Sequence, residues 1–431
     1  MNKKYNVLVF PAGEINASEI HTALSSQVNI EIFGASSVSR NGPYIFKNYR
    51  TGLPFISDDE FISCFNDLID EWNIDIVIPT HDSVVEFFSN NQDAFNCLTL
   101  SPNEHTANIC RDKLDTYLLF EDESFCPKFF QSLEVLNSSR CNELFLKPRR
   151  GQGSKGAKFI TKVQALSENI DFSEYVICEY LEGEELTIDC FTNYADQLLG
   201  VFPRTRARIL GGVSVSGKTL EADKEIMSIA DTINRKLKFN GMWYFQVRKD
   251  FNGKWKLLEI SARAAGAQCI TRARGVNLPL LSIYNAFKID VNVIGNDSVI
   301  HVERSFVNKY QTDIKYDTVF IDFDDTITKD RRVNPSIISL VYQFKNNNKK
   351  VHLITRHEGS IEDTLKDLCI DFRLFDSIIH LKNREKKSDY ITTDRTIFID
   401  NAFVERKEVK ESLGIPVFDV DTTEVLLEWR S

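Results

Sequence analysis

Two carboxylates one residue apart form the segment of the chain with the clearest chemical potential. Asp322 and Asp324 lie in the run VFIDFDDT, directly after apolar residues that are typical of a buried strand. A carboxylate can attack phosphorus to form an acyl phosphate, and a second one can protonate the leaving oxygen and then activate water. Because neighbouring carboxylates repel each other, we expect Mg²⁺, which prefers oxygen ligands, to hold them together. The pair therefore predicts hydrolysis of a phosphate ester.

The next apolar runs also end in polar residues. VHLIT ends in Thr355, whose hydroxyl can bind a phosphoryl oxygen, and TIFID ends in Asp400, which is placed to bind the metal. Since the carboxyl ends of parallel strands share one edge of a sheet, we expect these side chains close to Asp322. Between the two runs, the segment LKNREKKSDYI supplies lysines that can neutralise a phosphoryl group.

In this order, the motif DxDxT, the threonine, the lysines and the last aspartate resemble the haloacid dehalogenase-like phosphatases. The resemblance implies that Asp322 is the nucleophile and Asp324 the general acid/base. It also implies that Thr355 and one lysine bind the phosphate. We favour Lys387, because KKSDYI is similar to the start of the family's helix, and Lys382 is the alternative.

The same resemblance implies a Mg²⁺ site formed by Asp322, Asp324 and Asp400. Family members often carry a second acid at or soon after the next position, where this chain has Asn401 and, further on, Glu405. The C-terminal part is therefore expected to be a Mg²⁺-dependent enzyme that acts on a phosphomonoester.

A second candidate site lies earlier in the chain, where ELFLKPRRGQGSKGAKFI predicts a strand, a glycine-rich loop and another strand. The loop, which includes Gly153, offers backbone N–H groups to phosphate oxygens, and Lys147 on the strand beneath it can reach the α- and β-phosphates. Further along, VICEYLEGEELTID predicts a strand that turns and continues. Its backbone can bind an adenine edge, and Glu185 can hold ribose hydroxyls. Together these features predict an ATP site.

The run YFQVRKDFNGKWKLLEISARAAG predicts a β-hairpin that turns at 252–253. Gln246 lies on the first strand, and Glu259 and Ser261 lie on the second. Because strand side chains alternate, Glu259 and Ser261 point to one face. Oxygen ligands on neighbouring strands are what Mg²⁺–ATP requires.

This region resembles the ATP-grasp superfamily, and the pattern of Gln246 followed by Glu259, Ser261 and Arg263 is similar to its carbamoyl-phosphate-synthetase-like branch. Ser261 departs from the usual Asn, and a hydroxyl there implies weaker metal binding. The resemblance implies ATP-phosphate contacts for Lys113 and Lys147, an adenine hinge at Glu179, Tyr180 and Leu181, a ribose contact for Glu185, Mg²⁺ ligands at Gln246 and Glu259, and a phosphoryl contact for Arg263.

Three arginines alternate along VFPRTRARILGG, at Arg204, Arg206 and Arg208. On a strand they would share one face and could bind an anionic substrate through bidentate contacts. The alternative is a solvated basic edge of the sheet.

The surrounding pattern predicts a chain of several domains, with α/β and α+β architecture. Apolar runs alternate with amphipathic segments over residues 1–105, which predicts an N-terminal domain with a parallel sheet. Residues 106–310 are expected to form the ATP-grasp domain, and residues 313–431 a small Rossmann-like phosphatase domain. The spacing between its motifs is too short for an inserted cap, so we expect a capless domain.

Composition limits the classes of partner. The formal charge of −10 argues against a nucleic-acid partner. The nine cysteines form no CxxC pair, and no apolar run approaches the ~18 residues of a membrane span, so we expect reduced thiols, a cytoplasmic location and no membrane partner. A homo-oligomer is compatible with the sequence.

The leading hypothesis is a bifunctional enzyme. An ATP-dependent ligase would join a carboxylate to an amine through an acyl phosphate, releasing ADP and phosphate, and the phosphatase would act on the adduct or on a substrate. Tailoring of a surface sugar or small metabolite is a plausible setting by analogy. The alternatives are an ATP-grasp small-molecule kinase with a phosphatase domain, and a nucleotide-binding scaffold with an inert phosphatase.

Overall fold

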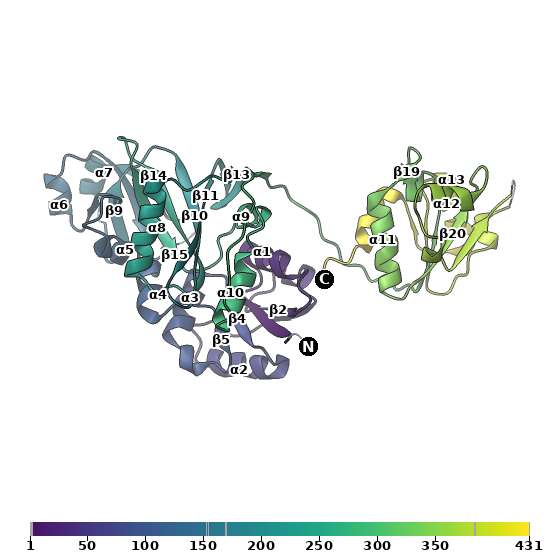
Figure 1. The fold of residues 1–431 in the computed structure, drawn as a ribbon, viewed down its shortest axis with the longest axis horizontal. Coiled ribbons are helices and arrows are strands. Elements are labelled where there is room, and N and C mark those ends of the chain that lie inside the picture. Colours follow the sequence, from purple (N-terminus) through teal and green to yellow (C-terminus); the bar gives the residue numbers. More distant parts are fainter. Residues whose placement is uncertain (1–2, 152, 154, 169, 383–384, 431) are drawn as a thin grey trace. The chain divides into compact units, whose positions relative to one another are not determined.

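The computed structural model describes residues 3–151, 153, 155–168, 170–382 and 385–430. Gln152 and Ser154 of the predicted phosphate-binding loop lie outside these ranges. The chain divides into two compact units, an N-terminal unit (Met1–Phe306) and a C-terminal unit (Val307–Ser431), both visible in Figure 1. The division of the first unit at residue 105 stays a prediction.

The N-terminal unit begins with a five-stranded parallel sheet in the order β3-β2-β1-β4-β5. This confirms the parallel sheet predicted from the first hundred residues. The chain order reverses beside β1, which makes the crevice beyond the ends of β1 and β4 a topological switch point. The elements of this part are β1 (Tyr5–Phe10), α1 (Ile15–Leu24), β2 (Ile30–Ser36), β3 (Asn48–Thr51), α2 (Phe61–Trp72), β4 (Ile76–Pro79), α3 (Asp82–Asn90) and β5 (Leu98–Thr99).

The strand β1 shows why these apolar runs become central strands. Its residues are almost all buried and alternate between two cores. Val7 and Val9 pack with α1 and α10, whereas Leu8 and Phe10 pack with phenylalanines of α2 and α3. A strand covered on both faces needs apolar residues at every position, which explains the continuous apolar run in the sequence.

Two antiparallel sheets follow, in the orders β6-β9-β7-β8 and β11-β10-β14-β15, with a small sheet β12-β13-β16 beside them. The strands are β6 (Phe129–Phe130), β7 (Glu143–Pro148), β8 (Lys158–Thr161), β9 (Tyr175–Glu179), β10 (Glu185–Thr192), β11 (Leu198–Thr205), β12 (Arg208–Leu210), β13 (Val213–Lys218), β14 (Gly241–Lys249), β15 (Trp255–Ser261) and β16 (His301–Glu303). The helices are α4 (Glu104–Arg111), α5 (Lys113–Leu119), α6 (Leu133–Ser138), α7 (Lys162–Ser167), α8 (Lys224–Lys236), α9 (Cys269–Ala273) and α10 (Leu278–Ala286).

The sheet that contains β14 has one apolar and one polar face. Trp243, Phe245 and Val247 are buried in a core that α8 covers with Ile226 and Ile229. The residues between them on β14 point to the opposite face, because side chains alternate along a strand. That opposite face carries the candidate site.

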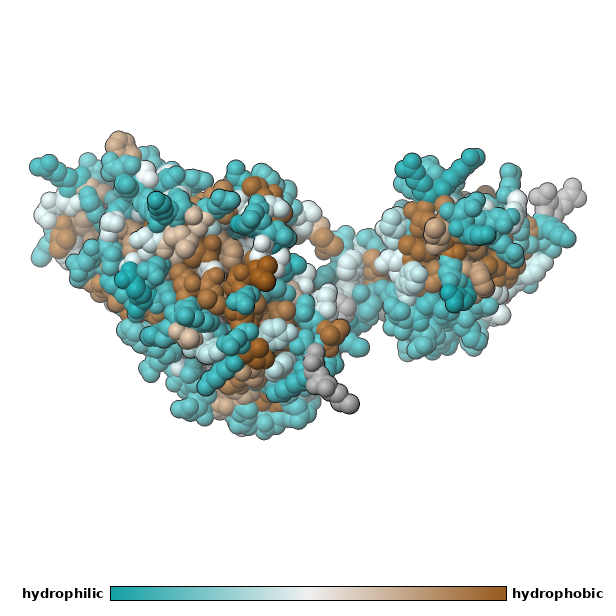
Figure 2. Space-filling model, in the orientation of Figure 1, coloured by the Kyte–Doolittle hydropathy of each residue, from teal (hydrophilic) through white to brown (hydrophobic). Residues whose placement is uncertain are grey.

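The face of the N-terminal unit shown in Figure 2 is mostly hydrophilic. On the face shown in Figure 2, hydrophobic residues gather over α10. Partly buried residues of α10, including Leu281 and Tyr284, belong there to the core shared with β1. Among the described residues, no helix has both the length and the hydrophobicity that a membrane span requires.

The C-terminal unit contains a parallel sheet in the order β21-β20-β17-β22-β23 and a small hairpin, β18 with β19. Its elements are β17 (Thr318–Ile321), β18 (Thr328–Lys329), β19 (Arg332–Val333), α11 (Pro335–Asn346), β20 (Lys350–Thr355), α12 (Ile361–Asp367), β21 (Ser377–His380), β22 (Thr396–Ile399), α13 (Phe403–Leu413) and β23 (Val417–Phe418). Short turns or 3₁₀ segments lie at Gly42–Tyr44, Gln92–Ala94, Phe323–Ile327, Phe372–Leu374, Lys387–Asp389 and Val420–Leu426.

Substitution of Phe245 tests the division of β14 into an apolar and a polar face. Its side chain is fully buried, so Phe245→Ala should lower the free energy of unfolding by about 3–5 kcal/mol through lost burial and a new cavity. Urea unfolding followed by tryptophan fluorescence measures the change. Phe251→Ala is the control, because this ring is 87% exposed, and it should change the free energy by less than about 0.5 kcal/mol. Equal effects would contradict the assignment of the faces.

Candidate active site

A cavity lined by residues of both antiparallel sheets brings the predicted nucleotide residues together. All seven of them line it, at Lys113, Lys147, Gly153, Glu179, Tyr180, Leu181 and Glu185. Arg206, Arg248, Gln246 and Glu259 line the same cavity. We call it the nucleotide cavity.

Lys147 lies on β7 and lines this cavity. It is 6% exposed, and its ammonium donates hydrogen bonds to the hydroxyl of Tyr117 and, at 3.2 Å, to the backbone oxygen of Leu258. Neither partner is a carboxylate, and among the described residues no ion pair neutralises the charge of Lys147. A buried ammonium without a counter-ion is suited to bind phosphate.

Lys113 begins α5 and also points toward the loop. Its ammonium donates a 2.9 Å hydrogen bond to the backbone oxygen of Gly151. Burial lowers the pKa of Lys113, Lys147 lowers it further, and the Glu259 carboxylate partly opposes the change. The first residue of the predicted glycine-rich loop is thus tied to a lysine that faces the cavity.

The residues predicted to contact the adenine base follow β9 at the wall of this cavity. The backbone N–H of Glu179 donates to the backbone oxygen of Lys128, and the backbone N–H of Lys128 donates to the Glu179 carboxylate. The Tyr180 ring meets Phe159 edge-on at 5.0 Å. Leu181 is buried beside them. Glu185 starts β10 and forms an ion pair with Arg206 at 2.6 Å. Its carboxylate therefore already has a cationic partner.

Two glycine turns meet above the cavity. Gly153 and Gly212 both have positive φ, which glycine adopts without strain. A Cβ placed on Gly212 would lie 2.7 Å from the Cα of Gly153. The turn between β12 and β13 therefore approaches the glycine-rich loop more closely than any side chain would allow.

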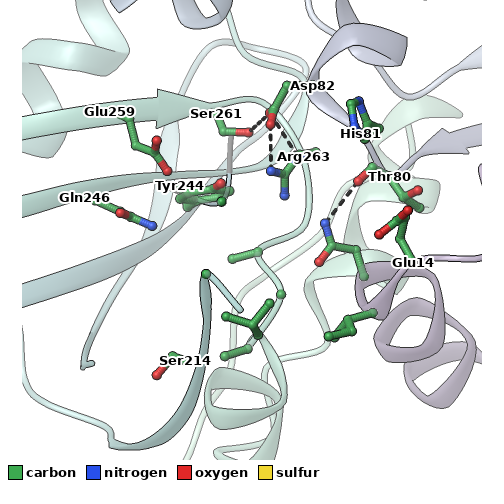
Figure 3. Close-up of a pocket in the computed structure, with 18 of the residues that line it drawn as sticks. Glu14, Thr80, His81, Asp82, Ser214, Tyr244, Gln246, Glu259, Ser261 and Arg263 are labelled. Atoms are coloured by element: carbon green, nitrogen blue, oxygen red, sulfur yellow. Dashed lines mark hydrogen bonds and ion pairs between the residues drawn. The ribbon is translucent and has the colours of Figure 1, made fainter. Parts of the chain in front are cut away.

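Gln246 and Glu259 face each other on paired strands. The register places Gln246 opposite Glu259 on β15 and opposite Thr187 on β10. Within the described part of the chain, neither the Gln246 amide nor the Glu259 carboxylate has a hydrogen-bond or ion-pair partner. Figure 3 shows the two side chains next to each other at the pocket wall. Amide and carboxylate oxygens on paired strands are the type of ligand that Mg²⁺ requires.

Ser261 and Arg263 have a different partner. Ser261 is 4% exposed, and its hydroxyl donates a 2.6 Å hydrogen bond to Asp82 at the start of α3. Arg263 donates to the same carboxylate from Nε at 2.9 Å and from Nη2 at 2.7 Å. Figure 3 shows all three contacts. The metal-ligand role expected of Ser261 stays a prediction, because in this structure its proton is directed to Asp82.

A second cavity adjoins the first on the side of the parallel sheet. We call it the acceptor cavity. Glu14, Asn16, Thr80 and His81, which follow β1 and β4 at the switch point, line it together with Gln246, Glu259 and Arg263. Asn16 donates a 3.0 Å hydrogen bond to the backbone oxygen of Thr80, which joins the two crevice walls.

The three alternating arginines are each paired with an acid. Arg204 and Asp189 are both 1% exposed and form a buried ion pair, with Nε 2.9 Å from the carboxylate. Arg206 pairs with Glu185, and the exposed Arg208 pairs with Glu303. Of these three arginines, Arg204 and Arg206 line the acceptor cavity. The solvated edge considered as an alternative therefore describes Arg208 but not the other two.

In the C-terminal unit, Lys387 lies between two predicted metal ligands. Its buried ammonium is 2.6 Å from Asp322 and 2.6 Å from Asp400. Burial raises the pKa of Asp322, and Lys387 offsets this only in part. Burial alone would lower the pKa of Lys387, but the two carboxylates outweigh it and raise the pKa. Lys382 makes no such contact in the described residues and pairs through its backbone with Glu385.

Asp324 and Thr355 both contact His357. The imidazole of His357 lies 3.0 Å from one oxygen of Asp324, and its backbone N–H donates to the Thr355 hydroxyl at 3.1 Å. Asp324 is directed toward His357, and no group of three or more His, Cys, Asp or Glu side chains among the described residues has a geometry that could hold a metal. The predicted Mg²⁺ set of Asp322, Asp324 and Asp400 stays a prediction.

Several site residues were not predicted from the sequence. Asp82 follows β4 at the carboxyl edge of the parallel sheet, and this position is a sequence signal that could have identified it. Tyr117, Tyr244 and His357 gave no such signal, because their roles depend on contacts between distant segments. Tyr244 lies under the guanidinium of Arg263, 5.5 Å from ring centre to carbon.

Comparison with known proteins agrees with the fold. The model of one protein family, described as ATP-grasp in the biosynthetic pathway with Ter operon, matches residues 171–335. No curated protein matches the chain.

Solved structures match about two thirds of the chain. An L-amino acid ligase from Bacillus licheniformis is 15% identical over 67% of this chain and 75% of its own, with a TM-score of 0.51. The biotin carboxylase domain of 2-oxoglutarate carboxylase from Hydrogenobacter thermophilus, in complex with MgADP, is 12% identical over 69% and 74%, with a TM-score of 0.56. N5-carboxyaminoimidazole synthetase from Staphylococcus aureus, complexed with ADP, is 10% identical over 68% and 80%, with a TM-score of 0.55. These likenesses, together with the family match, show the predicted ATP-grasp fold.

Arg204 supports a stability prediction. Arg204→Met leaves the Asp189 carboxylate buried without its cation, so the free energy of unfolding should fall by about 3–5 kcal/mol. Chemical denaturation measures the loss. Arg235→Met is the control, because this arginine is 68% exposed beside Asp231 and should change stability by less than about 1 kcal/mol. If Arg204→Met is as stable as wild type, Asp189 has another source of compensation.

Proposed function

We propose that the N-terminal unit is an ATP-dependent ligase that joins a carboxylate to an amine, with ATP and Mg²⁺. The observation that carries the proposal is the pair Gln246 and Glu259, which line both cavities. Among the described residues, neither side chain has a hydrogen-bond or ion-pair partner. A group bound between them would face the nucleotide on one side and a second substrate on the other. Transfer of a phosphoryl group between two substrates requires this arrangement.

The residues of the nucleotide cavity provide separate contacts for each part of ATP. The hinge Glu179–Leu181 binds the adenine, and Glu185 holds the ribose. Lys147 and Lys113 bind the phosphates together with the backbone of the loop around Gly153. Gln246 and Glu259 would hold Mg²⁺, which neutralises phosphate charge when bound.

The acceptor cavity receives the two other substrates. The carboxylate accepts the γ-phosphoryl group to give an acyl phosphate, and the amine then displaces phosphate. Arg263 lines this cavity and stabilises the transferring group through its N–H donors. An L-amino acid ligase among the matched structures supports the substrate class, carboxylate and amine.

We propose as a second activity that the C-terminal unit hydrolyses a phosphomonoester with Mg²⁺. The cluster Asp322, Lys387 and Asp400 supports it, because a buried lysine holds two carboxylates at the carboxyl edge of a parallel sheet. Asp322 serves as nucleophile, Asp324 as general acid/base, and Thr355 with Lys387 binds the phosphate. The haloacid dehalogenase-like assignment is part of this proposal.

The two activities on one chain suggest sequential steps on one compound. The phosphatase would remove phosphate from the ligated product or from one of its precursors. Tailoring of a surface sugar or small metabolite is the setting we propose.

Loss of Glu259 tests the ligase. Glu259→Ala removes a Mg²⁺ ligand, so ADP release from Mg²⁺–ATP with a panel of carboxylates and amines should fall about 100-fold or more. A coupled ADP assay measures it, and Glu225→Ala on α8 is the exposed control. ADP release that needs both carboxylate and amine supports the ligase. Release with one substrate alone would support a kinase instead, and an unchanged rate in Glu259→Ala would contradict both.

Loss of Asp322 tests the phosphatase. Asp322→Asn removes the nucleophile, so hydrolysis of p-nitrophenyl phosphate with Mg²⁺ should fall to background, whereas the exposed control Asp367→Asn keeps the wild-type rate. Addition of EDTA should have the same effect as the substitution. If wild type releases no phosphate above background, the C-terminal unit is an inert scaffold, and equal rates above background in wild type and Asp322→Asn would contradict the assignment of Asp322 as nucleophile.

A further inference from the structure

The carboxylate of Asp82 is the centre of a hydrogen-bond network, and the proposed ATP site gives this residue no role. It accepts three hydrogen bonds, one from Ser261 and two from Arg263, at 2.6–2.9 Å. Arg263 also donates from Nη1 to its neighbouring backbone oxygen, at Ala264. Its guanidinium lies over the ring of Tyr244. The side chain of Arg263 is therefore held on three sides.

We propose that Asp82 is the positioning residue for Arg263, so that the parallel sheet aligns the arginine that contacts the transferring phosphoryl group. This inference rests on the proposed ligase function. In this assignment Asp82 acts through Arg263 and makes no contact of its own with the transferring phosphoryl group. It acts by fixing the plane of the guanidinium, and a bidentate carboxylate contact has the required geometry.

The charges of the network favour a fixed pair. Burial alone would raise the pKa of Asp82, and the charge and hydrogen bonds of Arg263 outweigh it, so the pKa lies well below its usual range. Arg263 is only 10% exposed in its side chain, and Asp82 only 19%. Two ionised groups held out of water at this distance stay together, because separating them would leave each charge uncompensated.

Ser261 completes the network. It stands where the resembled branch has Asn, and its proton goes to Asp82 rather than to a ligand in the cavity. A serine is shorter than an asparagine, and it leaves room for a carboxylate that enters from α3. Figure 3 shows Asp82 in contact with both Ser261 and Arg263.

The arrangement links two parts of the unit that are far apart in sequence. Asp82 starts α3, directly after the crevice of β1 and β4, and Arg263 follows β15 in the other sheet. The hydrogen bonds between them span 181 residues. A second substrate in the acceptor cavity would lie beside this contact, because Asp82, Arg263 and His81 all line that cavity.

A transition-state mimic tests the proposal without an identified substrate. The full-length protein is titrated with Mg²⁺–ADP alone and then with Mg²⁺–ADP plus aluminium fluoride, which imitates the transferring phosphoryl group. Asp82→Asn keeps the shape of the side chain but removes its charge. We expect it to leave Mg²⁺–ADP affinity within about twofold and to reduce the tightening by aluminium fluoride about 10-fold or more, as for loss of a charged hydrogen bond.

Three further variants make the test specific. Arg263→Lys should lose the tightening to a similar extent, and the double variant Asp82→Asn/Arg263→Lys should lose little more, because the two residues act as one unit. Asp82→Glu keeps the charge and should recover part of the effect. Asp67→Asn, on the exposed face of α2, should behave as wild type.

The outcomes separate this inference from the ligase proposal. If wild type does not bind Mg²⁺–ADP, the proposed function fails and this inference fails with it. If wild type binds Mg²⁺–ADP but aluminium fluoride tightens it equally in wild type and Asp82→Asn, the ATP site stands and Asp82 has no positioning role. If Asp82→Asn loses affinity for Mg²⁺–ADP alone by as much as it loses affinity with aluminium fluoride, the inference is also overturned. Asp82 would then be a general structural support.

Discussion

The candidate ligase site depends on the register between β10, β14 and β15. Gln246 is opposite Thr187 on one side and Glu259 on the other, and this row brings two oxygen donors to one face of the sheet. A slip of one residue would turn Gln246 into the core and Phe245 toward solvent, because side chains alternate. Burial of Trp243, Phe245 and Val247 under α8 makes that slip costly. The hydrophobic face therefore determines the geometry of the polar one.

Much of this arrangement could be predicted from the sequence, for reasons that are local. The hairpin YFQVRKDFNGKWKLLEIS contains its own turn, so the strands that carry Gln246 and Glu259 can be paired without knowledge of the rest. The glycine-rich loop and Lys147 are neighbours in the chain. The apolar runs of β1, β4, β17 and β22 predict parallel strands, and their polar end residues mark one edge of each sheet.

What the sequence did not predict depends on contacts between distant segments. Asp82 meets Ser261 and Arg263 only because the parallel sheet packs against the end of β15. Arg204 has the spacing of a substrate arginine, yet Asp189 on the neighbouring strand pairs with it in the core. No local pattern distinguishes a guanidinium that faces a ligand from one that is neutralised by a strand partner. That difference requires the register of β10 and β11.

The contact between two glycines has a consequence for how ligands bind. Gly212 belongs to the turn between β12 and β13, and its backbone lies against that of Gly153 in the glycine-rich loop. Residues of both turns line both cavities. A molecule that shifts either turn therefore changes the space available beside the other, so the free energies of occupying the two cavities are not independent. Such linkage is reciprocal: whatever the first ligand does to the affinity of the second, the second does equally to the first.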